Sequence, residues 1–483
     1  MVAVISGTVV SDFNSSTTKL EPKGPPEKPS GLGTRHCQAF MTFLSTMLAY
    51  TMRVNLSVGI VAMTDQKGSN PNYMVLPWTI SQQGIILSAF FWGYMIPQVM
   101  AGHLARKFGP KYLLLGAMTV SSITTLLNPY IAMNCNWIVY CFTRMLIGFS
   151  QGFLFPCVNT HVAKWAPPSE RNRTFSFVFG GAQVGTVVTM VVAGYLAASP
   201  WGWPSIFYCT GVCSLTWALV WLFVGGNCPD SHSSISDIER EYIKSTLVSS
   251  SDDSKNMPTP WRQILTSGPV WTLLIVHCAE TWCFWMLLTM LPNYLRHVLK
   301  FEIKQNGLIS SLPYLGMWIM GLVFSWCADY VIEKQILPLD VSRKMWNTIA
   351  YWGGAASLVA LSVVHSVSGS VVLLTLGVSL NAAIYMGFLS NHLDLSPNFA
   401  GLLMGITNGF STIFAILAPM VTGFIVTDQT NREEWMISFY ISAGLFFFGN
   451  LVFLIFGSME VQRWNDPLVE VDSEKPSTHS INT

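Results

Sequence analysis

Long apolar stretches alternate with short polar segments along most of the chain. A membrane-spanning helix needs about 20 mostly apolar residues. Twelve stretches meet this requirement: 37–64, 81–104, 112–132, 137–162, 174–197, 204–225, 268–294, 306–328, 345–365, 369–390, 399–426 and 435–458. The longest polar interruption separates the sixth stretch from the seventh. The pattern predicts an all-α polytopic membrane protein with twelve transmembrane helices in two six-helix halves.

The polar interruptions also divide the chain into segments. Within the central one, Ser236-Asp237-Ile238-Glu239 is a capping-box pattern that predicts a short surface helix. The expected segments are a disordered tail (1–36), a six-helix bundle (37–225), a linker (226–265), a second bundle (266–458) and a polar tail (459–483).

The composition agrees with a membrane protein and argues against a soluble protein and a nucleic-acid-binding protein. Of the 483 residues, 51% are hydrophobic and 11% are charged, whereas a soluble domain is about 25% charged. The 26 basic and 25 acidic side chains nearly cancel, so we expect a lipid bilayer as the environment and no nucleic-acid partner. There is no P-loop, GxSxG or HExxH motif and no zinc-like Cys/His spacing. We therefore expect no enzyme activity, no cofactor and no metal site.

Basic residues predict the orientation. If the N-terminus is cytoplasmic, nineteen Lys and Arg fall in inner segments and five in outer ones. Cytoplasmic loops carry the excess of basic residues, so both termini are expected in the cytoplasm. The plasma membrane is the favoured location, and a vesicular or lysosomal membrane is the alternative.

Two arginines within apolar stretches are the strongest candidates for a binding site. A charge at the bilayer centre costs about 2.5–3.5 kcal/mol on insertion scales, so it needs a partner or a wet cavity. Arg53 and Arg144 lie at similar expected depths with few carboxylates nearby. A guanidinium donates paired hydrogen bonds to carboxylate or phosphate, so the pair predicts an anion site. In the alternative, Arg53 bridges to Glu280 and Arg144 bonds to backbone carbonyls.

Three further side chains are candidates at the same site. Glu280 and His277 are three residues apart on one helix face. They form either a cation-coupling or proton-relay pair, or an arginine counter-ion beside a satisfied polar histidine. Tyr94 either lines the cavity or packs among its aromatic neighbours.

Short Gly-rich basic loops occur at matching positions of the two halves and are expected to gate movement between them. The candidate gating residues are Gly102, Arg106 and Gly109 in the first half, and Asp329 and Arg343 in the second.

Seven motifs in order carry a family resemblance. They are RVNLSV (53–58), SAFFWGY (88–94), WAPPSER (165–171), GWPSIFY (202–208), PW with TSGPVW (260–261, 266–271), NHLDLSP (391–397) and QRWN (462–465). The chain resembles the family of sodium-phosphate cotransporters, sialin and vesicular glutamate transporters within the major facilitator superfamily. The resemblance implies the major facilitator fold, alternating access by the two halves, and substrate-binding roles for Arg53, Arg144 and Tyr94.

Departures from the family pattern bear on the substrate. Ile147 and Gln151 stand where sialin-like members carry carboxylates. Leu87 and Glu280 stand where glutamate-type members carry a histidine and an arginine, and Arg106 stands where an acid is usual in the superfamily.

These departures favour a symporter of inorganic phosphate, or of an organic anion, with sodium. We expect the protein to be a monomer. The alternatives are a proton- or potential-driven carboxylate carrier, an anion channel, or a receptor-like protein that transports nothing.

Overall fold

The structure is a computed structural model that describes residues 31, 33–65, 73–248 and 259–465, all of them helical or irregular. The first half holds α1 (Thr34–Thr64), α2 (Ile80–Phe108), α3 (Pro110–Asn134), α4 (Trp137–Gln151) with α5 (Leu154–Trp165), α6 (Pro168–Ala197) and α7 (Pro204–Val224). The second holds α10 (Gly268–His297), α11 (Ile303–Glu333), α12 (Leu339–Val363), α13 (Val367–Asn381) with η2 (Ala382–Tyr385) and α14 (Phe388–Leu395), α15 (Ala400–Ile425) and α16 (Arg432–Phe456). Between and after them lie η1 (Pro229–Ser231), α8 (Asp237–Val248), α9 (Trp261–Thr266) and η3 (Arg463–Asn465).

Twelve helical segments, which we call rods, cross the molecule, and two of these rods are interrupted by a short break. Within the described residues, ten rods are long and apolar enough to span a membrane, counting α4 with α5 and α13 with α14 as single rods. Two further helices, α2 and α12, have 29 and 25 residues and complete the set. The prediction of an all-α fold with twelve transmembrane helices is confirmed. The predicted disordered N-terminal tail lies almost wholly outside the described residues, and so does most of the C-terminal tail.

The break in the fourth rod follows from close packing. Gly152 sits against α2, where an added Cβ would lie 2.4 Å from Pro97 Cγ. The chain resumes as α5 with Pro156 in its first turn, where a missing N–H costs no helical hydrogen bond. Gly387 similarly precedes α14 in the tenth rod.

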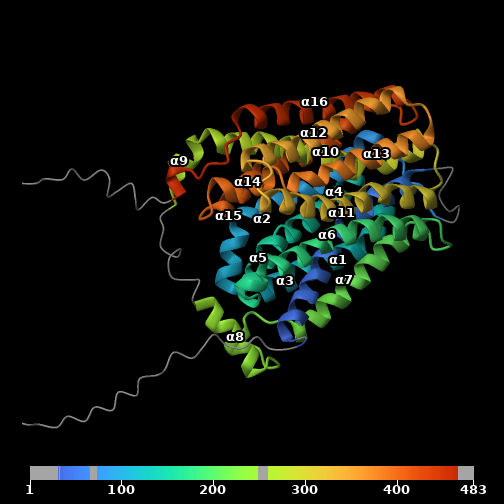
Figure 1. The fold of residues 1–483 in the computed structure, drawn as a ribbon. Helices are drawn as coiled ribbons and strands as arrows, with labels where there is room; N and C mark the ends of the chain where they lie inside the picture. Colours follow the sequence, from blue (N-terminus) through green and yellow to red (C-terminus); the bar gives the residue numbers. More distant parts are fainter. Residues whose placement is uncertain (1–30, 32, 66–72, 249–258, 466–483) are drawn as a thin grey trace, which may run out of the picture.

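The two halves lie side by side as separate bundles (Figure 1). Helix α2 packs on α15, α6 packs on α11, and α1 contacts α10. One end of the molecule, which we call the linker end, holds the linker helix α8 and the short helix α9. The start of α1 and the last described residues lie at the same end. We call the other the opposite end.

At the opposite end the halves are held together by side chains and by backbone. Arg296 forms an ion pair with Asp65, Asn293 donates to Gln83 Oε1 at 3.2 Å, and the Ser81 hydroxyl donates to a carbonyl of α15. Two glycine pairs bring backbones into direct contact. A Cβ on Gly84 would lie 3.2 Å from Gly423 Cα, and a Cβ on Gly194 would lie 3.0 Å from Gly307 Cα.

Four of the five candidate gating residues lie in helices and not in loops, which corrects the sequence expectation. Helix α2 continues through Gly102 and Arg106 to Phe108, and Gly109 alone joins it to α3. Gly109 has φ of +86°, a conformation that glycine adopts without a steric penalty, so one residue suffices for the turn.

The second-half candidates are also helical. Asp329 lies within α11 and Arg343 within α12, because the connection between these helices begins only after Glu333. Arg343 donates two hydrogen bonds to Asp394 of α14, at 2.8 and 3.1 Å, and a third to Met386 O.

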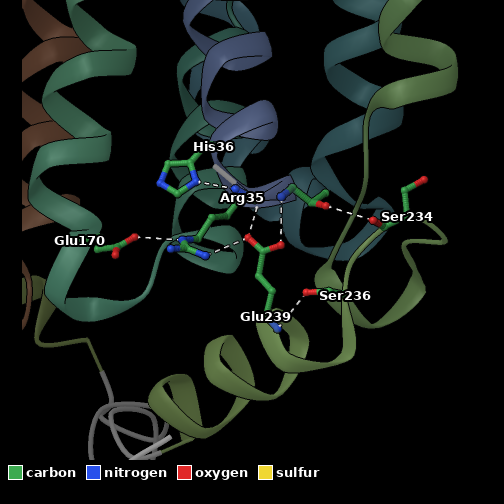
Figure 2. A network of polar contacts seen from close by, with 8 residues as sticks. Arg35, His36, Glu170, Ser234, Ser236 and Glu239 are labelled. Atoms are coloured by element: carbon green, nitrogen blue, oxygen red, sulfur yellow. Dashed lines mark hydrogen bonds and ion pairs between the residues drawn. The ribbon is translucent and has the colours of Figure 1, made fainter. Parts of the chain in front are cut away.

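The linker helix α8 is fixed to the first half by a buried charge cluster (Figure 2). Arg35, at the start of α1, contacts Glu239 of α8 at 3.0 Å and Glu170 of α6 at 3.1 Å. The Glu239 carboxylate also accepts from the backbone N–H groups of Thr34 and Arg35, which caps the start of α1. The Ser236 hydroxyl accepts from Glu239 N and so caps α8 in turn.

Candidate functional site: two arginines between the halves

Arg53 lies near the middle of α1 in a cage of aromatic rings. Its guanidinium carbon lies 4.6 Å from the centroid of Tyr50, 4.6 Å from Phe90 and 4.7 Å from Tyr94. Trp285 of α10 adds a fourth ring at 5.6 Å, from the other half of the molecule. Ring faces attract cations, so the cage steadies the charge without neutralising it.

The hydrogen bonds of Arg53 are few for so buried a group. Its side chain is 5% exposed, and its Nε has no partner. Within the described residues, the guanidinium is joined to Gln151 Oε1 by one long bond of 3.5 Å. Gln151 is itself held by a bond from its Nε2 to Ala49 O. A guanidinium has five N–H donors, so most of those on Arg53 remain for a ligand.

Arg144, on α4, lies beside Arg53 but is used differently. It donates to Met52 O at 3.3 Å and to Arg53 O at 3.1 Å. Its Nε is buried without a partner. The ring of Phe90 lies 5.7 Å from its guanidinium carbon, so one ring touches both arginines.

The geometry of the arginines agrees with part of each interpretation made from the sequence. The backbone bonding of Arg144 is the arrangement that the alternative interpretation described. The Arg53–Glu280 bridge of that interpretation is not formed, since no ion pair joins these two described side chains. The arginines lie together, as the anion-site prediction requires, and Arg53 makes fewer hydrogen bonds than Arg144 within the described residues.

Other side chains around Arg53 were not identified from the sequence. Tyr50 and Phe90 come from the first half and Trp285 from the second. Gln183 of α6 donates to the hydroxyl of Tyr385 in η2 at 3.3 Å, across the interface between the halves. Isolated aromatic and amide residues in apolar helices carry no pattern that separates cavity lining from packing.

Glu280 lies on the second-half side of this region. Both Tyr50 and Tyr385 are within electrostatic range of its carboxylate. Its one described hydrogen bond comes from the neighbouring Thr281 hydroxyl, at 3.5 Å. A carboxylate so weakly paired can attract a cation that enters with an anion.

His277 does not pair with Glu280. Its Nδ1 lies 3.0 Å from the hydroxyl of Thr407 on α15, and its ring is buried. The two proposed partners share a helix face, but their side chains belong to different polar networks.

The arrangement can hold a small anion at the interface between the halves. The positive charge comes from α1 and α4, the aromatic walls come from both halves, and Glu280 supplies a nearby negative group. A ligand bound to Arg53 touches parts of both bundles, so its binding energy can depend on how the bundles are placed.

Comparison with known proteins places the chain among transporters. Residues 42–419 match a family described as the Major Facilitator Superfamily. The chain is 36% identical to a Drosophila melanogaster protein named "Putative inorganic phosphate cotransporter", over 93% of this chain and 89% of that one. It is 33% identical to human sialin, over 93% and 95%, and 33% identical to human vesicular glutamate transporter 2, over 92% and 77%.

The fold is also similar to a solved structure. This is a bacterial homologue of the human lysosomal transporter Spinster, captured inward-facing and occupied. The TM-score is 0.65 at 13% identity, covering 87% of this chain and 96% of that one. At this identity the similarity shows the fold alone.

Proposed function

Since the chain belongs to the major facilitator superfamily, in the family of sodium-phosphate cotransporters, sialin and vesicular glutamate transporters, we propose that it is a sodium-coupled symporter of inorganic phosphate or another small anion. The observation that carries the proposal is Arg53, a buried guanidinium between the halves that has free donors and no carboxylate partner in the described part of the chain. Phosphate and carboxylate oxygens match its fork-shaped donors.

The proposed mechanism is alternating access. The anion binds Arg53 from a wet cavity, and Arg144 adds positive charge from the neighbouring helix. Binding relieves an uncompensated charge, so the loaded carrier can close where the empty one resists closure. Sodium enters near Glu280 and offsets the charge of the anion. We place both termini in the cytoplasm and the monomeric protein in the plasma membrane.

The deciding experiment is uptake into proteoliposomes with imposed sodium, proton and voltage gradients. Phosphate, glutamate and sialic acid are compared as substrates. We expect saturable phosphate uptake that rises with an inward sodium gradient and exchanges with internal phosphate. Flux without saturation or counterflow would mean a channel, and no flux at all would refute the transporter.

Glu280→Gln tests the coupling role within the same assay. The substitution removes one charge at nearly constant volume, so we expect sodium stimulation to disappear while sodium-independent uptake persists. Glu280→Asp, which keeps the charge, is the matched control. Unchanged stimulation in Glu280→Gln would remove Glu280 from the coupling role.

A second candidate is a proton- or potential-driven carboxylate carrier of a vesicular or lysosomal membrane. It is favoured by the 33% identity to sialin and to vesicular glutamate transporter 2, which matches that to the phosphate cotransporter within a few per cent. Uptake of glutamate or sialic acid driven by a proton or voltage gradient, without sodium, would select this candidate.

A further inference from the structure

A second buried polar cluster lies inside the second half, away from the arginines. The Thr407 hydroxyl of α15 stands between two imidazoles, with His277 Nδ1 at 3.0 Å and His392 Nε2 at 3.0 Å. The imidazole centroids are 6.3 Å apart, and the ring of Phe388 packs edge-on against His277. All three polar side chains are at least 95% buried.

The hydrogen bonds define which imidazole atoms carry hydrogen. His392 Nδ1 lies 3.1 Å from the backbone oxygen of Leu389, and a carbonyl only accepts. Nδ1 therefore donates, and in the neutral ring Nε2 is the acceptor. The Thr407 hydroxyl must then donate to His392 Nε2, which leaves its oxygen to accept from His277 Nδ1–H.

The hydroxyl has a third neighbour that makes a second arrangement possible. The backbone oxygen of Met404 lies 3.4 Å from Thr407 Oγ1. If a proton from water binds His392 Nε2, the hydroxyl hydrogen can turn to Met404 O. The oxygen then accepts from both imidazoles, since it has two lone pairs. One proton is gained, no covalent bond breaks, and every donor keeps an acceptor.

We propose that His277, Thr407 and His392 form a proton-binding site, in which Thr407 is the positioning residue that lets His392 take up one proton. The proposal rests on the transporter function and adds to it a site at which pH acts on the carrier. It applies whichever cation drives the anion.

Among the described residues, the groups facing the cluster supply no fixed counter-charge. On α10 the nearest carboxylate along the helix is Glu280, one turn away. On α14, Asp394 is engaged by Arg343 of α12. Tyr351 of α12 donates to Val276 O, and α15 carries no ionisable side chain. The charged form is therefore favoured only when water reaches the cluster.

Movement of the halves can control that access. Asn408, the residue after Thr407, donates to Gln98 Oε1 of α2 at 3.5 Å, across the interface. A shift of α15 against α2 would change this contact and the surroundings of Thr407 together. Proton uptake at the cluster would then favour one placement of the halves over the other.

Two measurements test the proposal. Histidine C2–H exchange, followed by mass spectrometry on the purified full-length protein, reports the titration of each imidazole directly. We expect the peptide containing His392 to show a titration step, and the step to shift in Thr407→Val but not in Thr407→Ser. If neither imidazole of the cluster titrates within the pH range in which the protein stays folded, the proposal is wrong, whatever the protein transports.

The second measurement is phosphate uptake as a function of pH on the linker side. We expect the rate to change at least fivefold between pH 8 and 5.5 in the wild type and in Thr407→Ser. In Thr407→Val and His392→Gln the change should fall below twofold. An unaltered pH profile in both variants would overturn the role in transport. Titration without uptake of any tested anion would instead refute the proposed function and leave the proton site standing.

Discussion

Helix α1 carries two buried arginines in opposite circumstances. Arg35, at the linker end, is 5% exposed and contacts two carboxylates, Glu170 and Glu239. Arg53, in the middle of the helix, is equally buried but contacts rings and one amide. The residue type and the burial are the same, and only the counter-charge differs.

The difference separates a structural charge from a binding one. Removing one member of a buried ion pair strands the other, so Arg35 is tied to stability. Among the described residues Arg53 has no carboxylate partner to strand, and its burial is an energetic cost that a bound anion can offset. A buried guanidinium without a carboxylate is thus a better guide to a binding site than burial or residue type alone.

The largest effect is expected from removing the paired arginine. Arg35→Gln leaves the buried Glu239 carboxylate without its cation, beside the partly exposed Glu170, and should lower the free energy of unfolding by about 3–5 kcal/mol. An unfolding titration in detergent measures the loss. Lys244→Gln, which breaks the exposed pair with Asp230, is the control and should leave stability unchanged. Wild-type stability in Arg35→Gln would contradict the structural assignment.

Removing the unpaired arginine should reduce transport and leave stability intact. In Arg53→Gln, stability stays the same or rises, while the kcat/KM of anion uptake falls about 100-fold, or about 2.7 kcal/mol. Arg53→Lys keeps the charge but lacks the forked guanidinium, so its kcat/KM should lie between those of the wild type and Arg53→Gln. Normal uptake by a well-folded Arg53→Gln protein would remove the central premise of the site.

A smaller effect is expected from giving Arg53 a partner. Gln151 Oε1 already faces the guanidinium. Gln151→Glu would place a carboxylate there and pair Arg53 with a negative charge, as Arg35 is paired. We expect the KM for the anion to rise about tenfold, or about 1.4 kcal/mol. Gln151→Met, similar in size and uncharged, should change KM by less than twofold. Equal effects of both substitutions would show that charge is not the cause.

The smallest effect concerns the cap that supports the paired cluster. Ser236→Ala removes the side-chain acceptor for Glu239 N at the start of α8 and should cost about 1 kcal/mol of helix stability. Faster tryptic cleavage after Arg240 would report the loosened helix. Ser233→Ala, an exposed change outside the helix, is the control. Identical cleavage rates in the two variants would show that the cap contributes little.

The sequence predicted the helices well because each span is a local property. An apolar run of about 20 residues needs no distant partner to be recognised. The same local reasoning identified Arg53 and Arg144, since a charge in an apolar run stands out by itself. The family motif singled out Tyr94, whose ring lies 4.7 Å from the guanidinium carbon of Arg53 and also stacks on Phe90, and its role in substrate binding stays a prediction.

What the sequence could not supply were pairings between distant segments. Arg35 resembled any basic residue near a membrane surface, because its partner Glu239 lies 204 residues away. His277 was paired by spacing with Glu280, whereas its contacts are with Thr407 and His392 on other helices. The sequence around Gly109 does not distinguish a single-residue turn from a longer loop, because glycine and basic residues are common in both.

The glycine pairs at the opposite end give the molecule a seam of bare main chain. Where Gly84 meets Gly423 and Gly194 meets Gly307, no long side chain has to be frozen or released as the bundles part. Such a closure depends on surface fit, so ionic strength should weaken the neighbouring Asp65–Arg296 contact more than the seam itself. No larger residue fits at these positions. Even the methyl group of alanine would push the two bundles apart at the opposite end and favour the conformation that is open there.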